Sequence, residues 1–206
     1  MSAASPPGRR QKKTAGVLRA LLKTYAMKIG CNDDRTPPVK IAARSQLVPS
    51  LASLAGALAG IVAVGFVASY FSLPLLIAPF GASVVLLFSV YDSPLAQPRN
   101  TVLGHVMSGA IGAAAALLHI AYFASGGEEK YVLIAISVAV SIFAMQILRL
   151  THPPAGATAF LASTAVTDAS SLVWFMIPVA AGALILVAVA IAFNNAIPKR
   201  RYPVYW

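Results

Sequence analysis

Four long apolar stretches constrain this chain more than any other feature of its sequence. They cover residues 47–71, 101–123, 131–148 and 171–193, and none of them contains a lysine, arginine, aspartate or glutamate. Each is long enough to cross the roughly 30 Å hydrocarbon core of a bilayer as a helix. Two shorter apolar runs lie between them. The pattern predicts an all-α integral membrane protein whose surroundings are the lipid bilayer.

The positive charge is concentrated beside the terminal stretches. The formal net charge is +10; ten of the 16 basic residues precede Ser45, and three more follow residue 198. Basic residues that flank terminal spans follow the positive-inside rule. We therefore expect both termini in the cytoplasm and no nucleic-acid partner. The predicted domains are a basic, partly disordered cytoplasmic segment 1–44, a transmembrane domain 45–198 and a cytoplasmic tail 199–206.

A histidine followed by two prolines interrupts the second half of the chain. His152, Pro153 and Pro154 stand directly before a run of small residues. A Pro-Pro pair cannot continue a preceding helix, but a proline readily occupies the first position of a new one. Irregular backbone at membrane depth is tolerated where it is buried in protein or lines a polar cavity. The break is therefore the first candidate for a functional site. The alternative is that the prolines merely kink an ordinary span.

A second copy of this pattern indicates an internal repeat. Residues 79–83 and 154–158 both consist of Pro-x-Gly-Ala followed by serine or threonine, at an offset of 75 residues. The same offset places the first and second long stretches largely on the third and fourth. We predict two repeats, 47–123 and 131–198. Each contains a long segment, a short broken segment and a long segment, which makes six segments in total.

The number of crossings decides how the two repeats are related. If both short segments cross the membrane, there are six crossings, and Arg99 and Arg149 lie on the cytoplasmic side. If both are re-entrant, there are four, and these arginines lie outside. The positive-inside rule favours six crossings. Because three crossings per repeat is an odd number, the repeats are then inverted, an arrangement that recurs in transporters with the substrate site near the midplane.

The two predicted helix starts carry the chemistry that we expect at the site. A helix that starts at Pro79 or Pro154 leaves unpaired N–H groups in its first turn, which bear about half a positive elementary charge. Two such starts facing each other suit a small anion. No Asp or Glu lies inside a predicted span, which disfavours cations. The residues expected to bind the substrate at these starts are Gly81, Ala82, Ser83, Gly156, Ala157 and Thr158.

Three further polar residues are expected to complete the site. His152 precedes the second break, and its protonation would change the charge of the site; the simpler interpretation is a histidine that hydrogen-bonds a carbonyl group at a helix end. His105 is a second buried titratable group. Asn100 directly precedes the second long stretch, where an asparagine is most often a cap. We expect His105 and Asn100 to line the site and His152 to tune it.

Catalytic and cofactor-binding motifs are not evident in the sequence. It contains no His-Glu-x-x-His array, no Gly-x-Ser-x-Gly elbow and no cysteine pair. We predict a protein that is not an enzyme and has no catalytic residues, metal or cofactor. An intramembrane enzyme that uses the two histidines remains a third hypothesis. Gly104, Ser108 and Gly112 recur at four-residue spacing, the small-residue face on which membrane helices pack. Such spans are also compatible with a homo-oligomer.

The motifs resemble those of the HPP family of integral membrane proteins. The resemblance rests on residues 151–159 (THPPAGATA), 79–83, 93–100 and 104–105. It implies a membrane protein of bacteria and plastids, a family usually described with four membrane helices, and members linked to nitrite transport. Since four helices match the four long stretches, the count of four or six crossings stays open.

Together these features predict a transporter or channel for a small inorganic anion, nitrite first. The anion would bind between the two broken-helix starts. The main alternative is a membrane scaffold or assembly protein without transport activity, in which the breaks are only structural. No signal peptide is evident, because no short apolar segment with a small-residue cleavage site precedes residue 47. An organellar transit peptide is an alternative for so basic a leader, but we expect the bacterial inner membrane rather than an organellar envelope.

Overall fold

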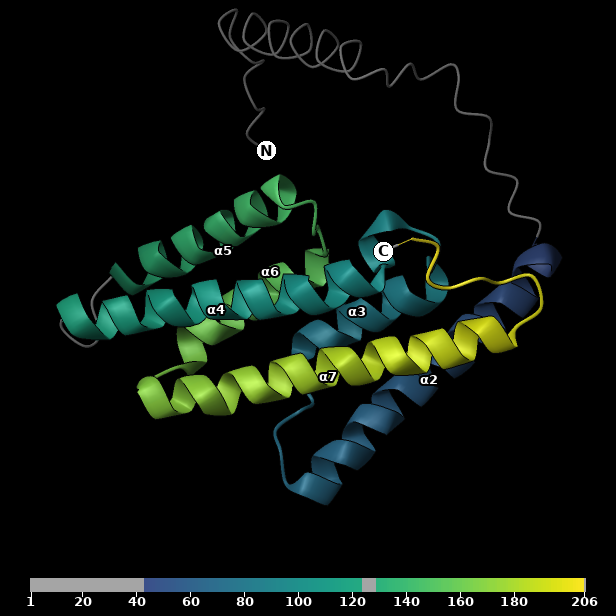
Figure 1. The fold of residues 1–206 in the computed structure, drawn as a ribbon, viewed down its shortest axis with the longest axis horizontal. Helices are drawn as coiled ribbons and strands as arrows, with labels where there is room; N and C mark the ends of the chain where they lie inside the picture. Colours follow the sequence, from purple (N-terminus) through teal and green to yellow (C-terminus); the bar gives the residue numbers. More distant parts are fainter. Residues whose placement is uncertain (1–42, 124–128, 206) are drawn as a thin grey trace, which may run out of the picture. The chain divides into compact units, whose positions relative to one another are not determined.

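The structure, a computed structural model, describes residues 43–123 and 129–205. The basic segment predicted over residues 1–44 lies almost entirely outside the described residues. Residues Ser45–Trp206 form one compact unit, and its described part is built from helices alone (Figure 1). They are α2 (Ala43–Phe71), α3 (Ala78–Ser89), the short 3₁₀ helix η1 (Pro94–Ala96), α4 (Pro98–Tyr122), α5 (Glu129–Ile147), α6 (Pro153–Ala165) and α7 (Ala169–Ala196).

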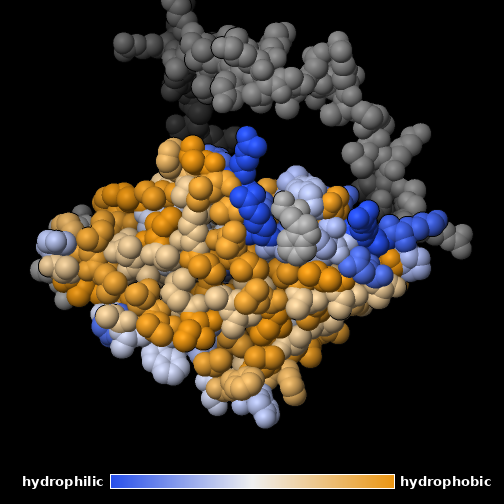
Figure 2. Space-filling model, in the orientation of Figure 1, coloured by the Kyte–Doolittle hydropathy of each residue, from blue (hydrophilic) through white to orange (hydrophobic). Residues whose placement is uncertain are grey.

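Four of these helices, α2, α4, α5 and α7, are long and apolar enough to cross a bilayer. Large apolar side chains are exposed along the outer helices, as Leu54, Leu58 and Phe66 of α2 illustrate. Figure 2 shows hydrophobic residues over most of the face in view. A water-soluble protein rarely exposes so much contiguous apolar surface. The prediction of an all-α integral membrane protein is confirmed for the described residues.

The two short helices begin at the predicted breaks. Ile77 precedes α3 with extended backbone (φ −105°, ψ 143°), and Pro79 lies in the first turn. His152 precedes α6 in the same way (φ −136°, ψ 96°), and Pro153 is the first helical residue. A shift of 75 residues maps α3 onto residues 153–164, one residue short of α6 itself. The prolines therefore start separate helices and do not merely kink continuous ones.

The loop before α4, the end of α5 and the C-terminal residues meet at one end of the helices. Arg99 donates a hydrogen bond to the carbonyl oxygen of Leu148 (3.2 Å), and the hydroxyl of Tyr202 donates one to the carbonyl oxygen of Ala96 (2.7 Å). We call this the basic end, because of the exposed or half-exposed side chains there: Arg99, Arg149, Lys199, Arg200 and Arg201.

Gln97 ties the C-terminal residues to this loop. Its Nε2 donates hydrogen bonds to the carbonyl oxygens of Tyr91 (3.0 Å) and Ser93 (2.8 Å). Its Oε1 accepts one from the backbone N–H of Val204 (2.9 Å). The side chain of Arg200 lies over the ring of Tyr91, 4.7 Å from its centroid. The C-terminal residues therefore pack back onto the helices.

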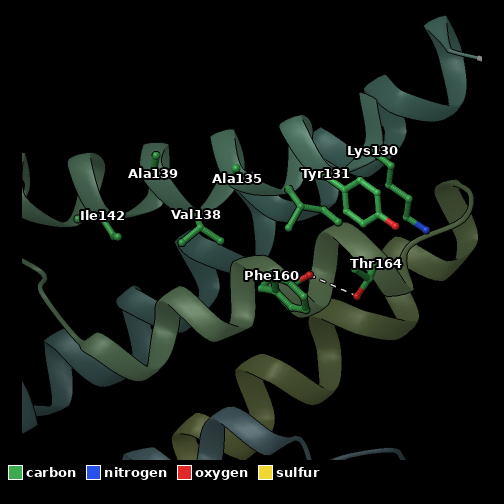
Figure 3. Close-up of a pocket in the computed structure, with 9 residues that line it drawn as sticks. Lys130, Tyr131, Ala135, Val138, Ala139, Ile142, Phe160 and Thr164 are labelled. Atoms are coloured by element: carbon green, nitrogen blue, oxygen red, sulfur yellow. Dashed lines mark hydrogen bonds between the residues drawn. The ribbon is translucent and has the colours of Figure 1, made fainter. Parts of the chain in front are cut away.

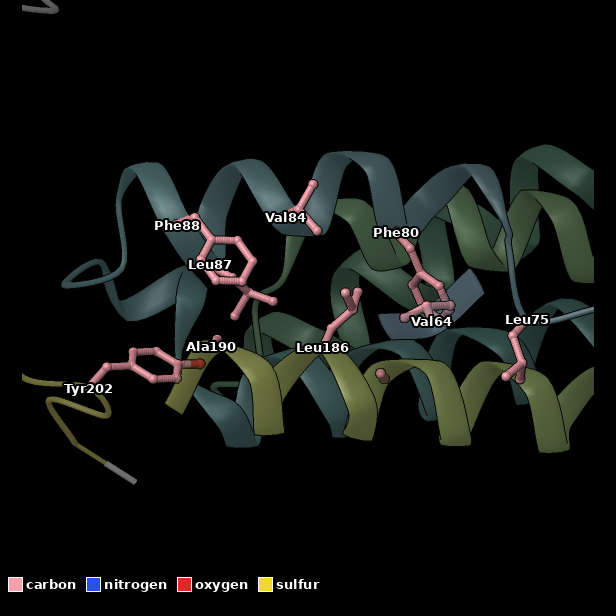
Figure 4. Packing of buried hydrophobic residues seen from close by; sticks show 10 residues of the cluster. Val64, Leu75, Phe80, Val84, Leu87, Phe88, Leu186, Ala190 and Tyr202 are labelled. Atoms are coloured by element: carbon pink, nitrogen blue, oxygen red, sulfur yellow. The ribbon is translucent and has the colours of Figure 1, made fainter. Parts of the chain in front are cut away.

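The main hydrophobic core joins α3 to α7 (Figure 4). Phe80 and Phe88 of α3 and Leu186 of α7 are fully buried, and Val64 brings α2 into the same cluster. Buried residues of α3 recur at three- and four-residue spacing, which is the periodicity of one helix face. On α7, a Cβ atom at Gly182 would overlap the ring of Phe80. These contacts hold α3 with one fixed face inward.

Among its neighbours, α4 packs most extensively against α6. Its small residues Gly104, Ser108 and Gly112 are all buried. A Cβ atom at Gly104 would lie 3.0 Å from the Cβ of His152, and one at Gly112 would overlap the backbone carbonyl group of Ala159. Backbones this close leave no room for larger side chains. The predicted packing face of small residues is therefore present on α4.

Asp168 caps the start of α7. Its carboxylate accepts hydrogen bonds from the backbone N–H groups of Ser170 and Ser171, and the hydroxyl of Ser171 accepts one from the N–H of Asp168. Hydrogen bonds from the Ser170 hydroxyl, and then from the Ser171 backbone, lower the pKa of the Asp168 carboxyl to about 2. The carboxylate is thus used at a helix end, outside the apolar spans.

We expect Gly112→Ala to destabilise the protein, because the added methyl group meets the backbone of Ala159, which cannot rotate away. Overpacking of this kind costs about 1–3 kcal/mol. Gly156→Ala is the matched control: it is also a helical glycine, and nothing lies within 4 Å of the added Cβ atom. Thermal unfolding in detergent should show a lower midpoint for Gly112→Ala alone. Equal midpoints would contradict the close approach of α4 and α6.

Candidate functional site

Four polar side chains form one connected, buried group inside the helices. Ser83 belongs to α3, His105 to α4 and Thr158 to α6, and His152 directly precedes α6. None of the four has exposed surface. We call them the histidine cluster. Because unpaired polar groups are costly away from water, the members of such a group have to satisfy one another.

His105 lies between the hydroxyl groups of Ser83 and Thr158, two residues that occupy equivalent positions at the 75-residue offset. Its Nε2 lies 2.8 Å from the Oγ of Ser83, and its Nδ1 lies 2.7 Å from the Oγ1 of Thr158. The ring of Phe80 packs edge-on against it, with 5.2 Å between the ring centroids. A single imidazole therefore connects the two predicted repeats, and its orientation is fixed on three sides.

His152 links the cluster to the loop at the basic end. Its Nδ1 lies 2.8 Å from the carbonyl oxygen of Leu95 in η1, and its Nε2 lies 3.0 Å from the Oγ of Ser83. A carbonyl oxygen can only accept, so Nδ1 of His152 must carry a hydrogen. In the neutral ring Nε2 is then an acceptor. The hydroxyl of Ser83 therefore donates to it.

The remaining hydrogen positions follow from this assignment. Because Ser83 has one hydroxyl hydrogen and gives it to His152, its oxygen accepts from Nε2 of His105. Nδ1 of the neutral His105 ring is then an acceptor, and the hydroxyl of Thr158 donates to it. With both rings neutral, the hydrogen bonds run in one direction. They lead from Thr158 through His105, Ser83 and His152 to the carbonyl group of Leu95.

Ser83 reaches the cluster because of its place on α3. It shares the buried helix face with Phe80 and Val84, whose packing turns that face inward. Its hydroxyl also lies 3.2 Å from the carbonyl oxygen of Pro79, one turn earlier. The Ser83 hydroxyl thus has a second acceptor within reach, to which it can turn without any movement of the backbone.

Two buried hydroxyl groups beside the cluster have no hydrogen-bond partner among the described residues. They belong to Thr101 and Ser108, about one turn before and one turn after His105 on the same face of α4. Neither side chain has exposed surface. Orphaned groups of this kind mark places where water, an ion or a substrate binds. The sequence analysis named neither as a site residue, although both lie at helical spacing from His105.

The other residues predicted for the site lie outside the cluster. The amide of Asn100 donates a hydrogen bond to the carbonyl oxygen of Thr151 (3.1 Å), so it fixes the backbone next to His152. The structure thus brings four of the nine predicted residues together. Four more lie at the two helix starts, where only Gly156 is half-buried and the rest are exposed: Gly81, Ala82, Gly156 and Ala157.

Two surface hollows lie away from the cluster. One of about 760 Å³ lies between α5 and α6, and apolar side chains such as Val138 and Ile142 dominate its lining (Figure 3). It suits lipid chains better than an ion. The other, about 350 Å³, lies between the last turns of α4, which contain His119, the end of α6 and Lys130 of α5. Nε2 of His119 is buried there without a partner in the described part of the chain; the sequence assigned this residue no role.

The chemistry available to the cluster is hydrogen bonding and proton exchange. Within residues 43–123 and 129–205, no group of three or more His, Cys, Asp or Glu side chains lies close enough to hold a metal ion. Hydroxyl groups and imidazoles both donate and accept hydrogen bonds, and imidazoles change charge on protonation. The chemistry of these side chains therefore allows hydrogen bonding to a polar partner and the exchange of a proton.

We predict opposite tautomers for the two histidines of the cluster. Near neutral pH, His152 should carry its hydrogen on Nδ1 and His105 on Nε2, because the carbonyl group of Leu95 fixes the direction of the hydrogen bonds. Solid-state NMR of ¹⁵N-histidine-labelled protein in bilayers measures this directly. The chain has three histidines, so His119→Gln leaves the two of interest. Finding the single hydrogen of His152 on Nε2 would contradict the assignment.

Comparisons with known proteins agree with the membrane character of the chain. A curated transmembrane protein of Dictyostelium discoideum is 32% identical over 208 residues, which cover 96% of this chain and 68% of that protein. A second transmembrane protein of the same organism is 36% identical over 132 residues, or 64% of this chain, and the match spans 41% of its own length. No solved structure matches significantly.

The family follows from a match that covers most of the chain. The family model described as "HPP, transmembrane region" matches residues 42–203. That range includes every member of the histidine cluster and all the motifs on which the resemblance rested. The protein belongs to the HPP family of transmembrane proteins.

Proposed function

We propose that the protein transports a small inorganic anion, most simply nitrite, by way of the histidine cluster. One observation carries this proposal: a connected set of buried polar side chains inside apolar membrane helices. Polar groups in such a place are expensive and commonly belong to substrate or proton paths. The residues that we assign to the path are Ser83, His105, His152 and Thr158, with the orphaned hydroxyls of Thr101 and Ser108 beside them.

The chemistry of this path favours an anion over a cation. The hydroxyls of Thr101 and Ser108 are free to donate, and an imidazole adds a positive charge when it is protonated. A cation site needs carboxylates or converging carbonyl groups. The described acidic residues Asp92 and Asp168 lie outside the four apolar spans. Nitrite carries one negative charge and can accept hydrogen bonds on both oxygens, which suits adjacent donors.

The proposed topology has six crossings in two inverted repeats, with both termini in the cytoplasm. In support, the hydroxyl of Ser53 near the start of α2 donates to the carbonyl oxygen of Phe88 near the end of α3 (2.9 Å). In this topology the chain runs away from the basic end in α2 and returns to it by the end of α3. Helix α5 brings it back to that end a second time, and helix α7 a third time. The positive-inside rule makes that end cytoplasmic, as in the predicted bacterial inner membrane.

The inverted arrangement supplies a way to move the anion past an occluded cluster. The four side chains of the cluster have no exposed surface, so solvent does not reach them in this conformation. In transporters built from inverted repeats, one repeat rocks against the other around a fixed site and exposes it to each side in turn. We assign the same role to the two halves of this chain, which meet at His105.

A membrane scaffold is the second candidate, and one observation favours it. The helices α2 and α5 are the least buried of the four long helices, so their apolar faces are available to partner helices or to a second copy of the chain. A scaffold, however, gains nothing from orphaned hydroxyls and buried imidazoles, which cost stability. We therefore rank transport first, and we propose no enzymatic activity.

Thr101→Val tests the proposed path with little risk to the fold. Valine has nearly the same shape, and replacing a buried hydroxyl that has no partner is close to neutral or stabilising. If this hydroxyl donates to the anion, its loss removes a hydrogen bond to a charged group, worth about 1.5–3 kcal/mol. Nitrite flux into proteoliposomes at low substrate should fall about tenfold or more. Thr164→Val, which removes an exposed hydroxyl, is the matched control.

The same assay separates the candidate functions. Wild-type flux above that of protein-free vesicles, lost in Thr101→Val and kept in Thr164→Val, supports transport through the cluster. Equal fluxes in both variants would remove Thr101 from the path. If folded wild-type protein moves neither nitrite, nitrate, formate nor chloride, transport is excluded, and the scaffold hypothesis takes its place.

A further inference from the structure

We propose that the histidine cluster is a proton relay and that each anion crosses together with one proton. This inference rests on the proposed transport function and says how that transport is driven. It starts from the unbroken run of hydrogen bonds that joins Thr158, His105, Ser83 and His152. Every ring nitrogen in this run is engaged, and the run continues to the carbonyl group of Leu95.

The geometry satisfies the requirements of a relay. The four links measure 2.7, 2.8, 3.0 and 2.8 Å, all within the normal range for hydrogen bonds. Each interior member donates one bond and accepts another, so a proton can pass along the run from Thr158 as far as His152. If His152 had only a structural role, the hydrogen bond to the carbonyl group of Leu95 would suffice, and the second bond to Ser83 would not be needed.

The transfer can be written with all protons accounted for. When the moving repeats open the Thr158 side of the cluster, the oxygen of Thr158 takes up a solvent proton. Its former O–H bond breaks as an N–H bond forms at Nδ1 of His105, which becomes an imidazolium ion. The N–H bond at Nε2 of His105 then breaks as a new O–H bond forms on Ser83. The former O–H bond of Ser83 breaks as an N–H bond forms at Nε2 of His152. Ser83 is unchanged overall, and the positive charge has moved from His105 to His152.

The relay must reset before a second proton can follow. After the transfer, His152 has to release its extra proton to water when the basic end opens, because the carbonyl group of Leu95 cannot take it up. His105 has to return its hydrogen from Nδ1 to Nε2, and the hydroxyl of Ser83, which points toward His105, has to turn back toward His152. The carbonyl oxygen of Pro79 lies 3.2 Å from the Ser83 hydroxyl oxygen and can hold its hydrogen during that rotation. This rotation of the Ser83 hydroxyl needs no backbone movement, because Pro79 is in the same helix.

The surroundings of the two rings contain no described charge that would hold the proton in place. Neither α3, α6 nor α7 contains a charged residue within its bounds. On α4 the ionisable groups besides His105 are Arg99, His119 and Tyr122, and Arg99 bonds the carbonyl oxygen of Leu148. Helix α5, which packs against α4 and α6, contributes Lys130 and Tyr131. The loops and tail at the basic end contribute the other described groups, and no hydrogen bond joins any of these residues to the histidine cluster: Tyr91, Asp92, Arg149, Lys199, Arg200, Arg201, Tyr202 and Tyr205.

Coupling the two movements has a clear physical advantage. A lone anion inside apolar helices is strongly disfavoured, because it has left water for a medium of low dielectric constant. A proton on His105 or His152 next to the anion cancels its charge. The pair then crosses without net charge, and a pH gradient across the membrane can drive the anion.

The test measures anion and proton movement in the same vesicles. Proteoliposomes carry a pH-sensitive dye, the membrane potential is clamped at zero with potassium and valinomycin, and external nitrite or nitrate is added at an acidic external pH. Protein-free vesicles give the passive rate of nitrous acid. We expect the wild type to acidify the lumen by about one proton per anion, and anion uptake to rise at least tenfold with a pH gradient of two units.

Four variants locate the effect in the relay. Ser83→Ala should lose the protein-dependent acidification and the response to the pH gradient, because a methyl group cannot pass a proton; Ser83→Thr keeps the hydroxyl and should restore both. Thr158→Val removes the hydroxyl at the start of the relay with almost no change of shape. It should lose the acidification and the response to the pH gradient as well, and it takes the place of Ser83→Ala in the test if Ser83→Ala does not fold. Ser89→Ala removes an exposed hydroxyl of α3 and should behave like the wild type.

The outcomes separate this inference from the proposed function. Wild-type anion uptake that follows the membrane potential and leaves the internal pH unchanged would overturn the relay while transport stands. Coupling that survives in both Ser83→Ala and Thr158→Val would also overturn it. A folded wild-type protein that moves no anion at all overturns the proposed function, and the anion-coupled relay with it.

Discussion

The carbonyl group of Leu95 can only accept a hydrogen bond, and the direction of every hydrogen bond in the histidine cluster depends on that restriction. It assigns a hydrogen to Nδ1 of His152, which in turn determines what Ser83, His105 and Thr158 do. Without it, either tautomer of either ring would satisfy its neighbours, and the cluster would have no preferred direction. A backbone group in a short loop thus decides the state of side chains on three helices.

The sequence was sufficient to predict where the two short helices begin and which polar residues are buried, but not which face each short helix turns inward. Proline chemistry places the starts of α3 and α6 correctly, since it is a local constraint. The prediction that Gly81 and Ala82 join Ser83 overlooked the helical period: Phe80 packs against α7, which leaves these two residues on the outer side. The partner of His152 could not be foreseen, because Leu95 reaches it through tertiary packing 57 residues away along the chain.

The two halves of the chain contribute unequally to the centre. The 75-residue offset pairs Ser83 with Thr158, and both hydroxyls contact His105. By the same offset His105 corresponds to Ala180, and His152 to Ile77. The two predicted repeats therefore share a site that is not itself repeated. The ring of His105 lies between the hydroxyls of Ser83 and Thr158. The ring of His152 contacts only Ser83 of these two and bonds the loop at the basic end.

Two consecutive carbonyl groups bind different parts of the molecule. The carbonyl oxygen of Leu95 accepts a hydrogen bond from His152, and that of Ala96 accepts one from the hydroxyl of Tyr202. The last few residues of the chain are therefore mechanically connected to the polar centre through a single peptide unit. A substitution or a bulky label at Tyr202 is therefore expected to disturb the same short loop that orients the histidines.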